Sequence, residues 1–520
     1  MQTVVLLRLS RYASPGMAFV FTLLSLGQQK PQSVPGIYLY QKRIMVRRFL
    51  HNTCILVLCL AAVSPVFTQS QTKEGYAIKN VNVIPMDQER IIPGQTVIVE
   101  DGVITKIGPN INPGRKVAII DGGGKWLIPG FFDMHVHFFY EQGEHNNTCE
   151  AELKMMLANG MTTARILAGH PAYLDARRKV SVGVWPGPEL IIASPQLVGK
   201  WPWPPDFKNY EIVDSKDKAE AAVHRFKREG YEAIKITFMV KAEVYDAIIE
   251  SARKEGIRVT GHVGPLVKLP RALKTGQQIE HMDEFIEMLL PDTSYNHGQS
   301  VSDMNIWRKE AWATVPFLDE DKIPALVTAV KNSGIYVSPT NYFFVSTFGE
   351  PMTEEQIKKT VGYRYIPSVI KKERWQNWDH YNKNAPPEAS RRRYVQLRKQ
   401  MAYQLWRAGV PLMAGSDSPE FFVVQGFSLH DELEMFVRSG LTPFASLQTA
   451  TINPAKYLGV DKLKGTIGPG KQALMLLLDK NPLEDIKNTN TINAVFMGKK
   501  WYDKATIEKM LAEAAQILGK

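Results

Sequence analysis

A pair of histidines, one residue apart, closes an apolar stretch of the chain. The segment from Gly130 to Phe139 reads GFFDMHVHFF, so that His135 and His137 follow a run of large apolar residues. Residues i and i+2 of an extended strand project to the same side, and both imidazoles therefore face one direction. Two interpretations fit this pattern. The pair is either a chance feature of a strand end, with one imidazole bound to a carboxylate, or a bidentate metal clamp.

Further side chains capable of chemistry stand at the ends of other short apolar runs. One histidine ends VTGH, a second ends QIEH, a lysine lies between isoleucines in AIKIT, and an aspartate lies in GSDS. Imidazole nitrogen and carboxylate oxygen suit zinc or a similar divalent ion. The sequence therefore predicts a metal site. Its candidate ligands are His135, His137, Lys235, His262, His281 and Asp417.

Two of these candidates also have a structural interpretation. Lys235 fits an edge-strand lysine whose long side chain reaches water. Asp417, in Ser416-Asp-Ser418, fits a helix N-cap. Six further histidines, all beyond the targeting segment, stand outside this pattern, and we expect them to serve on the surface, around the site or in the packing. They are His145, His170, His224, His297, His380 and His430.

The middle of the chain alternates short apolar strands with helical stretches such as Ala219–Glu229 and Ala242–Gly256. This alternation predicts a parallel (β/α)8 barrel, an α/β fold that places its chemistry at the carboxyl ends of the strands. The candidate ligands would then meet at one rim. The predicted strands are Leu127–Met134, Thr162–Leu167, Leu190–Ala193, Ala233–Phe238, Ile257–His262, Gln278–His281, Ile335–Pro339 and Pro411–Gly415.

Short strands broken by turn residues flank this middle on both sides, between 76 and 126 and again between 473 and 501. They predict one small β-sandwich domain that is built from both ends of the mature chain. The expected divisions are a targeting segment at 1–72, the β domain at 73–126 plus 455–505, the barrel at 127–454 with insertions at 197–210, 285–330 and 343–408, and a C-terminal helix at 506–520.

These motifs give the chain a specific resemblance. It resembles the amidohydrolase superfamily of metal-dependent hydrolases, and most closely a secreted bacterial type in its prolidase-like and imidazolonepropionase-like branch. One departure lies in the closing β segment, where Lys471-Gln-Ala-Leu474 lacks the aspartate that the family carries. The matching text lies at 129–137, 160–165, 231–236, 259–264, 279–284, 408–419, 429–459 and 465–471.

The resemblance implies a binuclear centre, with two zinc ions per chain as the expected metals. His135 and His137 would hold the buried ion with Asp417, and His262 and His281 would hold the more exposed one. Lys235 would combine with carbon dioxide to form a carbamate that bridges both ions. Its isoleucine neighbours suit the neutral, desolvated amine that this reaction needs.

The resemblance also implies a reaction. A hydroxide that bridges the metals would attack a carbonyl carbon, with Asp417 as the general base and then the general acid. The expected substrate is a small molecule with an amide-type C–N bond: a dipeptide, an N-acyl amino acid or a cyclic amide. A mononuclear deaminase and a lactone or phosphotriester hydrolase are alternatives on the same site. A non-catalytic binding protein is disfavoured, because every expected ligand position is filled.

The net charge of +11 is concentrated at the N-terminus, since residues 1–72 hold seven basic and no acidic residues. Subtracting these seven leaves +4 for the rest of the chain, and no nucleic-acid motif is present. Arg47 and Arg48 precede the apolar run 54–63 and a polar stretch, which is the layout of a secretory signal.

We therefore expect a signal peptide at about 45–70, translation from Met45 and a periplasmic or secreted protein without stable membrane insertion. An N-terminal membrane anchor is the alternative. Cys54 and Cys59 would leave with the signal, so Cys149 alone would remain and no internal disulfide would form. The sequence leaves homo-oligomerisation open.

Overall fold

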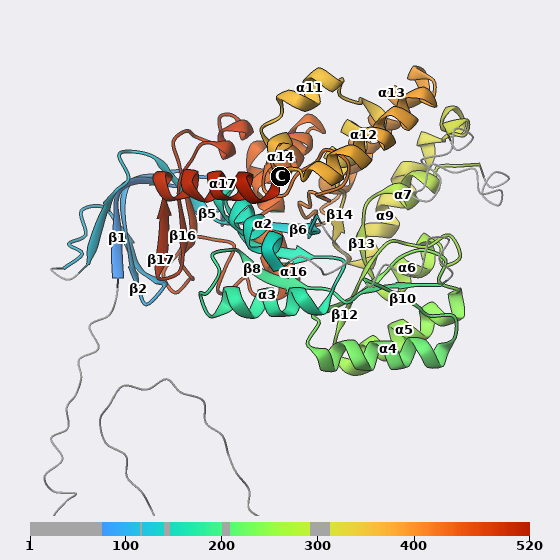
Figure 1. Ribbon diagram of the computed structural model, residues 1–520, viewed down its shortest axis with the longest axis horizontal. Helices are drawn as coiled ribbons and strands as arrows, with labels where there is room; N and C mark the ends of the chain where they lie inside the picture. The colour runs from blue at the N-terminus through green and yellow to red at the C-terminus, as the bar shows by residue number, and fades with distance from the viewer. Residues whose placement is uncertain (1–74, 115–116, 140–145, 200–208, 292–311, 520) are drawn as a thin grey trace, which may run out of the picture. The chain divides into compact units, whose positions relative to one another are not determined.

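The structure is a computed structural model that describes residues 75–114, 117–139, 146–199, 209–291 and 312–519 (Figure 1). The described residues belong to one compact unit. The predicted targeting segment at 1–72 and parts of two predicted insertions, 197–210 and 285–330, lie outside the described residues, as do His145 and His297. Among the helices in the described ranges, none combines the length and apolar character needed to cross a bilayer.

Parallel strands form a closed ring in the middle of the chain. Consecutive strands pair in parallel within two sheets. Three parallel bridges close the ring, Ala193 to Ala233, Val337 to Leu412 and Val136 to Ser418. The predicted (β/α)8 barrel is therefore confirmed. Its strands are β6 (Phe131–Val136), β7 (Met161–Ile166), β8 (Glu189–Ile192), β11 (Ala233–Ile236), β12 (Arg258–Gly261), β13 (Gln278–Glu280), β14 (Val337–Ser338) and the extended segment 411–418.

The prediction of a single strand over Leu127–Met134 is wrong. Its first half belongs to β5 (Trp126–Pro129), which pairs with the β domain, and its second half is the barrel strand β6. Gly130 separates them at a very close approach, because a Cβ atom there would lie 2.1 Å from Thr162 Cγ2. The absence of a side chain at this position lets the chain pass from one sheet to the other.

Both ends of the described chain build the β domain, as predicted. Its strands share one sheet in the order β17-β16-β15-β5-β1-β2-β3, with β4 beside β1. The sheet curls over a core of its own, and β3 approaches the segment before β15 through the bridge from Val103 to Gln472. The strand-like run from Ala494 to Trp501 is a hairpin that turns at Gly498. The remaining strands are β1 (Gly75–Val83), β2 (Ile92–Glu100), β3 (Val103–Gly108), β4 (Ala118–Asp121), β15 (Leu474–Leu478), β16 (Ile492–Met497) and β17 (Lys500–Asp503).

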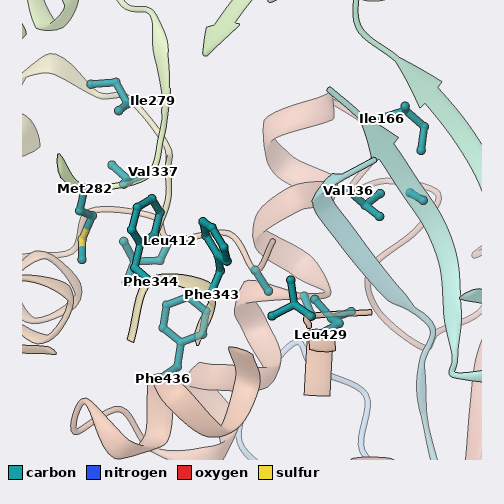
Figure 2. Packing of buried hydrophobic residues seen from close by; sticks show 14 of the residues in the cluster. Val136, Ile166, Ile279, Met282, Val337, Phe343, Phe344, Leu412, Leu429 and Phe436 are labelled. Atoms are coloured by element: carbon teal, nitrogen blue, oxygen red, sulfur yellow. The ribbon is translucent and has the colours of Figure 1, made fainter. Parts of the chain in front are cut away.

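Helices surround the ring, and Figure 1 shows α4 and α5 side by side along one edge of the molecule. The apolar sides of the strands and helices share one core. Figure 2 shows part of this core, where Val337 and Ile279 lie near Phe344, and Phe436 comes from α14. The main helices are α2 (Asn146–Ala158), α3 (Pro171–Ser181), α4 (Lys216–Glu229), α5 (Ala242–Glu255), α6 (Leu269–Thr275), α9 (Ile323–Ser333), α14 (Phe427–Arg438), α15 (Pro443–Thr449), α16 (Ile452–Leu458) and α17 (Lys504–Leu518).

The segment between β14 and the last barrel strand, which contains the predicted insertion at 343–408, is helical and rich in aromatic residues. Most of its aromatic rings pack against one another; Trp375, for example, contacts Trp378 and Phe422. These rings fasten the helices to each other and to the loop after Asp417. The helices are α10 (Asn341–Phe344), α11 (Glu354–Lys359), α12 (Ser368–Lys383) and α13 (Glu388–Arg407).

A buried carboxyl attaches the start of this segment to the barrel. Glu432 of α14 is fully buried and accepts hydrogen bonds from the backbone N–H groups of Asn341 (3.0 Å) and Tyr342 (2.6 Å). Burial raises the pKa of Glu432 to about 8, although these hydrogen bonds and Arg398 act in the opposite direction. The folded protein thus holds a proton here at pH values where an unfolded chain has lost it.

The free energy of unfolding should therefore fall as the pH rises from about 4.5 to about 8, by up to about 1.4 kcal/mol per pH unit for this one carboxyl. We expect Glu432→Gln to flatten that slope, because an amide carries no titrating proton. Urea unfolding of both proteins at pH 5, 6.5 and 8 measures the slopes. Parallel slopes would show that Glu432 is ionised in the folded protein.

Candidate metal centre

The six candidate ligands lie at the carboxyl ends of neighbouring barrel strands. His135 is in β6 with His137 just beyond it, and Lys235 is in β11. His262 and His281 directly follow β12 and β13, and Asp417 lies in the closing segment. All are buried except His262, which is partly exposed.

Asp417 joins three of the histidines. Its Oδ1 atom lies 3.1 Å from His135 Nε2 and 3.6 Å from His137 Nε2, and its Oδ2 atom lies 3.6 Å from His281 Nδ1. Burial acts to raise the pKa of Asp417, but His135, His281 and hydrogen bonds from His135 and His137 outweigh it and hold this pKa well below its usual range. The carboxylate is ionised, as a metal ligand must be.

The four imidazoles form a continuous group. The ring centroid of His135 lies 5.3 Å from that of His137 and 4.7 Å from that of His281, which in turn lies 4.5 Å from that of His262. Ligand atoms of His135, His281 and Asp417 all lie within 4.8 Å of one another. Burial lowers the pKa of His281 well below its usual value, so this ring is neutral and its nitrogen can bind a cation.

Two of these residues have unusual backbone conformations. His281 and Asp417 have φ angles of 69° and 52°, in the left-handed region that non-glycine residues rarely occupy. Each residue follows a strand whose alternation would otherwise direct the next side chain away from the barrel axis. The left-handed turn instead brings both side chains into the imidazole group. Backbone strain of this kind is concentrated at functional sites.

Lys235 lies beneath this group with 1% of its surface exposed. Every residue of β11 is buried, and the Lys235 backbone N–H donates to Ser194 Oγ at 3.1 Å. Its positive charge acts on the pKa of Glu280 and of His281, so the amine lies within electrostatic range of the candidate site. The snorkelling alternative is therefore excluded for this lysine, since its side chain stays in the interior.

Hydrogen bonds to the Nδ1 atoms of two imidazole rings set the orientation of these rings. His135 Nδ1 pairs with Glu280 Oε2 at 2.9 Å, and His281 Nδ1 pairs with Thr340 Oγ1 at 2.6 Å. These contacts leave the Nε2 atom of each ring for a metal. The sequence analysis missed both partners. Glu280 had one visible signal, because an acidic residue within a buried strand needs a partner.

Asp133 is a further residue that the sequence analysis missed. Its buried carboxylate accepts hydrogen bonds from the Ser416 backbone N–H (3.1 Å) and hydroxyl (2.6 Å) and from the His135 N–H (3.2 Å). These bonds tie the last barrel strand to the first next to Asp417. The Asp417 backbone N–H also donates to the His135 carbonyl at 2.8 Å. Asp417 therefore closes the ring and is not a helix cap.

Aromatic rings cover the partly exposed side of the imidazole group. Phe238, beyond β11, lies 4.7 Å from His262 between ring centroids, and Phe344 of α10 lies 5.3 Å from His281. Phe344 belongs to the predicted insertion at 343–408. Tyr342, in the same helix, forms a hydrogen bond with Asp431 on α14.

The other noted residues have structural partners. Arg165, near the end of β7, donates to Glu280 Oε1 at 2.6 Å. His170 caps α3, and His224 pairs with Glu255 on the surface. His430 is buried between Thr489 and Asn159, consistent with a packing role.

Curated relatives match a short part of the chain. A dihydroorotase from Carboxydothermus hydrogenoformans is 39% identical over 88 residues, which are 17% of this chain and 20% of that protein. The chain therefore aligns with about a fifth of the length of this relative.

Solved structures match most of the chain in fold. A bottromycin amidohydrolase has 21% identity and a TM-score of 0.65, and the match covers 86% of this chain and 92% of that one. A putative prolidase from Bifidobacterium longum has 22% identity and a TM-score of 0.61, with 85% and 99% covered. At these identities the likeness shows the fold.

A family model decides the relationship. The model described as "Amidohydrolase family" matches residues 126–501, which include all six candidate ligands and every barrel strand. The resemblance of the motifs to the amidohydrolase superfamily is thus confirmed, and this chain belongs to the amidohydrolase family.

Proposed function

We propose that this protein is a metal-dependent hydrolase that cleaves an amide-type C–N bond of a small molecule. The observation that carries the proposal is the contact of one ionised aspartate, Asp417, with three of four clustered imidazoles. Membership of the amidohydrolase family and the amidohydrolase and prolidase folds among the structural neighbours support it.

The donor set fits two divalent ions, which we propose to be zinc. Four imidazoles, one carboxylate and a lysine carbamate are borderline-to-hard ligands of the kind that zinc binds. His135, His137 and Asp417 would hold one ion, and His262 and His281 the other. Lys235, desolvated beside Glu280 and His281, would serve both ions as a carbamate, because an ammonium group there would repel them.

Bound divalent ions supply an acidified water molecule and a Lewis acid for a carbonyl oxygen. Asp417 orients the attacking water and accepts its proton, since its carboxylate is ionised and stands among the ligand rings. The same carboxyl then gives the proton to the leaving nitrogen. Phe238 and Phe344, against His262 and His281, keep other water away from the reacting atoms.

We propose a dipeptide, an N-acyl amino acid or a cyclic amide as the substrate class. The six convergent groups favour a binuclear hydrolase over a mononuclear deaminase, which needs fewer ligands and an unmodified lysine.

The layout of residues 45–70 also supports export of the protein to the periplasm or medium.

Purification with zinc and bicarbonate, followed by assays on dipeptides, N-acyl amino acids and cyclic amides, tests the function. We expect about two zinc ions per chain by elemental analysis and release of an amine from at least one of the three classes. One ion per chain with release of ammonia would identify the deaminase instead. If the purified protein binds no divalent metal, the proposed function is wrong.

A further inference from the structure

We propose that Glu280 is the positioning residue of the metal centre: it orients His135 for metal binding and supplies a buried negative charge that Arg165 balances. This inference rests on the proposed metal site. It adds the interior residues that set the orientation and the donor strength of one metal ligand, His135. Glu280 directly precedes the ligand His281 but serves a different ring.

The geometry is a chain of contacts through the barrel interior. Glu280 Oε2 lies 2.9 Å from His135 Nδ1, and Glu280 Oε1 accepts hydrogen bonds from Arg165 Nη2 (2.6 Å) and Thr260 Oγ1 (2.5 Å). Glu280 is fully buried, and His135 and Arg165 are each 1% exposed. Both carboxylate oxygens therefore have fixed partners, and neither can turn away from its own.

Arg165 is held just as firmly. Its Nε atom donates to the Met134 carbonyl and its Nη1 atom to Gln278 Oε1, both at 2.6 Å. These two hydrogen bonds fix the orientation of the guanidinium, and its Nη2 atom points at Glu280. Three strands contribute to this arrangement: β6 provides the imidazole, β7 the guanidinium and β13 the carboxylate.

The carboxylate and the guanidinium have different roles at the metal centre. A carboxylate on one nitrogen of an imidazole fixes the tautomer, directs the other nitrogen at the metal and makes that nitrogen a stronger donor. A buried carboxylate without a cation would carry a large desolvation cost, which Arg165 offsets. The His135 Nε2 atom is accordingly the one that faces Asp417, at 3.1 Å.

The test measures zinc affinity by competition with a chromophoric chelator, using the full chain stripped of metal and zinc as the probe. We expect Glu280→Gln to weaken zinc binding by about 10- to 100-fold, since the amide keeps the shape but loses the charge. With cobalt(II) in place of zinc, its visible absorption bands should shift as well.

Glu432→Gln is the matched control. It makes the same carboxyl-to-amide replacement at an equally buried residue that contacts Asn341 and Tyr342, neither of which is a candidate ligand. Because Glu432 holds its proton near neutral pH, this control replaces a buried carboxyl without removing a charge. We expect wild-type zinc affinity and an unshifted cobalt spectrum from it, even though its stability changes. Equal effects of the two substitutions would mean that any buried carboxyl produces the loss, and would overturn the inference.

A double variant separates positioning from folding. Glu280→Gln leaves the Arg165 cation without its counter-ion, so the single variant is expected to lose stability. Arg165→Met together with Glu280→Gln removes both charges; it should recover stability and still bind zinc weakly. Recovery of wild-type affinity in the double variant would overturn the inference. A wild-type protein that binds no zinc would overturn the metal centre itself.

Discussion

Asp417→Asn is expected to lower kcat/KM for amide hydrolysis by about 10³- to 10⁴-fold, the range of a lost general base, while leaving the fold intact. The substitution keeps the size of the side chain and its contacts with His135 and His137. It removes the charge that a metal ion needs and the basic oxygen that accepts a proton from water. Initial rates on the best substrate, with zinc in excess, measure the effect.

The control for this substitution is Asp431→Asn. Asp431 is also a carboxyl near the barrel rim, but its partner is the Tyr342 hydroxyl and not a candidate ligand. We expect its rate to stay within a few-fold of wild type. If Asp417→Asn hydrolyses the substrate as fast as Asp431→Asn does, then Asp417 has no role in proton transfer.

Lys235→Met is expected to lower metal content and activity without lowering the stability of the metal-free protein. Metal content should fall below one ion per chain and activity should fall by at least about 10³-fold, because methionine cannot form the carbamate that we propose to bridge the two ions. Yet the metal-free variant should unfold no more easily than the metal-free wild type, because methionine avoids the cost of burying an amine. Elemental analysis, initial rates and thermal unfolding measure these three quantities.

The dependence of reactivation on bicarbonate tests the proposed carbamate directly. Wild-type protein stripped of metal should recover activity with zinc only when bicarbonate is present, and its intact mass should rise by one carbon dioxide. Lys241→Met, on the exposed N-cap of α5, changes the same type of residue six positions further on and should behave as wild type. Full metal content and activity in Lys235→Met would refute the bridging role.

Local sequence patterns predicted most of the architecture. Strand-like and helix-like runs predicted the closed ring and the β domain built from both ends, and both are present. The spacing of His135 and His137 predicted imidazoles on one side of a strand, and their rings lie 5.3 Å apart. Such patterns succeed because side-chain alternation and apolar periodicity are properties of the local backbone.

The same patterns failed where the backbone departs from them. Alternation does not reveal that the run through Gly130 leaves one sheet for another, since both halves are equally apolar. Strict alternation also places Glu280 and His281 on opposite sides of their strand. Glu280 lies in the interior as part of β13, and His281 also reaches the site because the chain turns left-handed at this residue.

The sequence by itself determined the fold class, the family and the identity of the six candidate ligands, because these depend on residue types and short spacings. Only the tertiary structure decided that Glu280 orients His135, that Arg165 balances Glu280 and that Asp133 ties the closing segment to β6. These pairs join residues more than a hundred positions apart, and packing, not local periodicity, determines which buried charges meet.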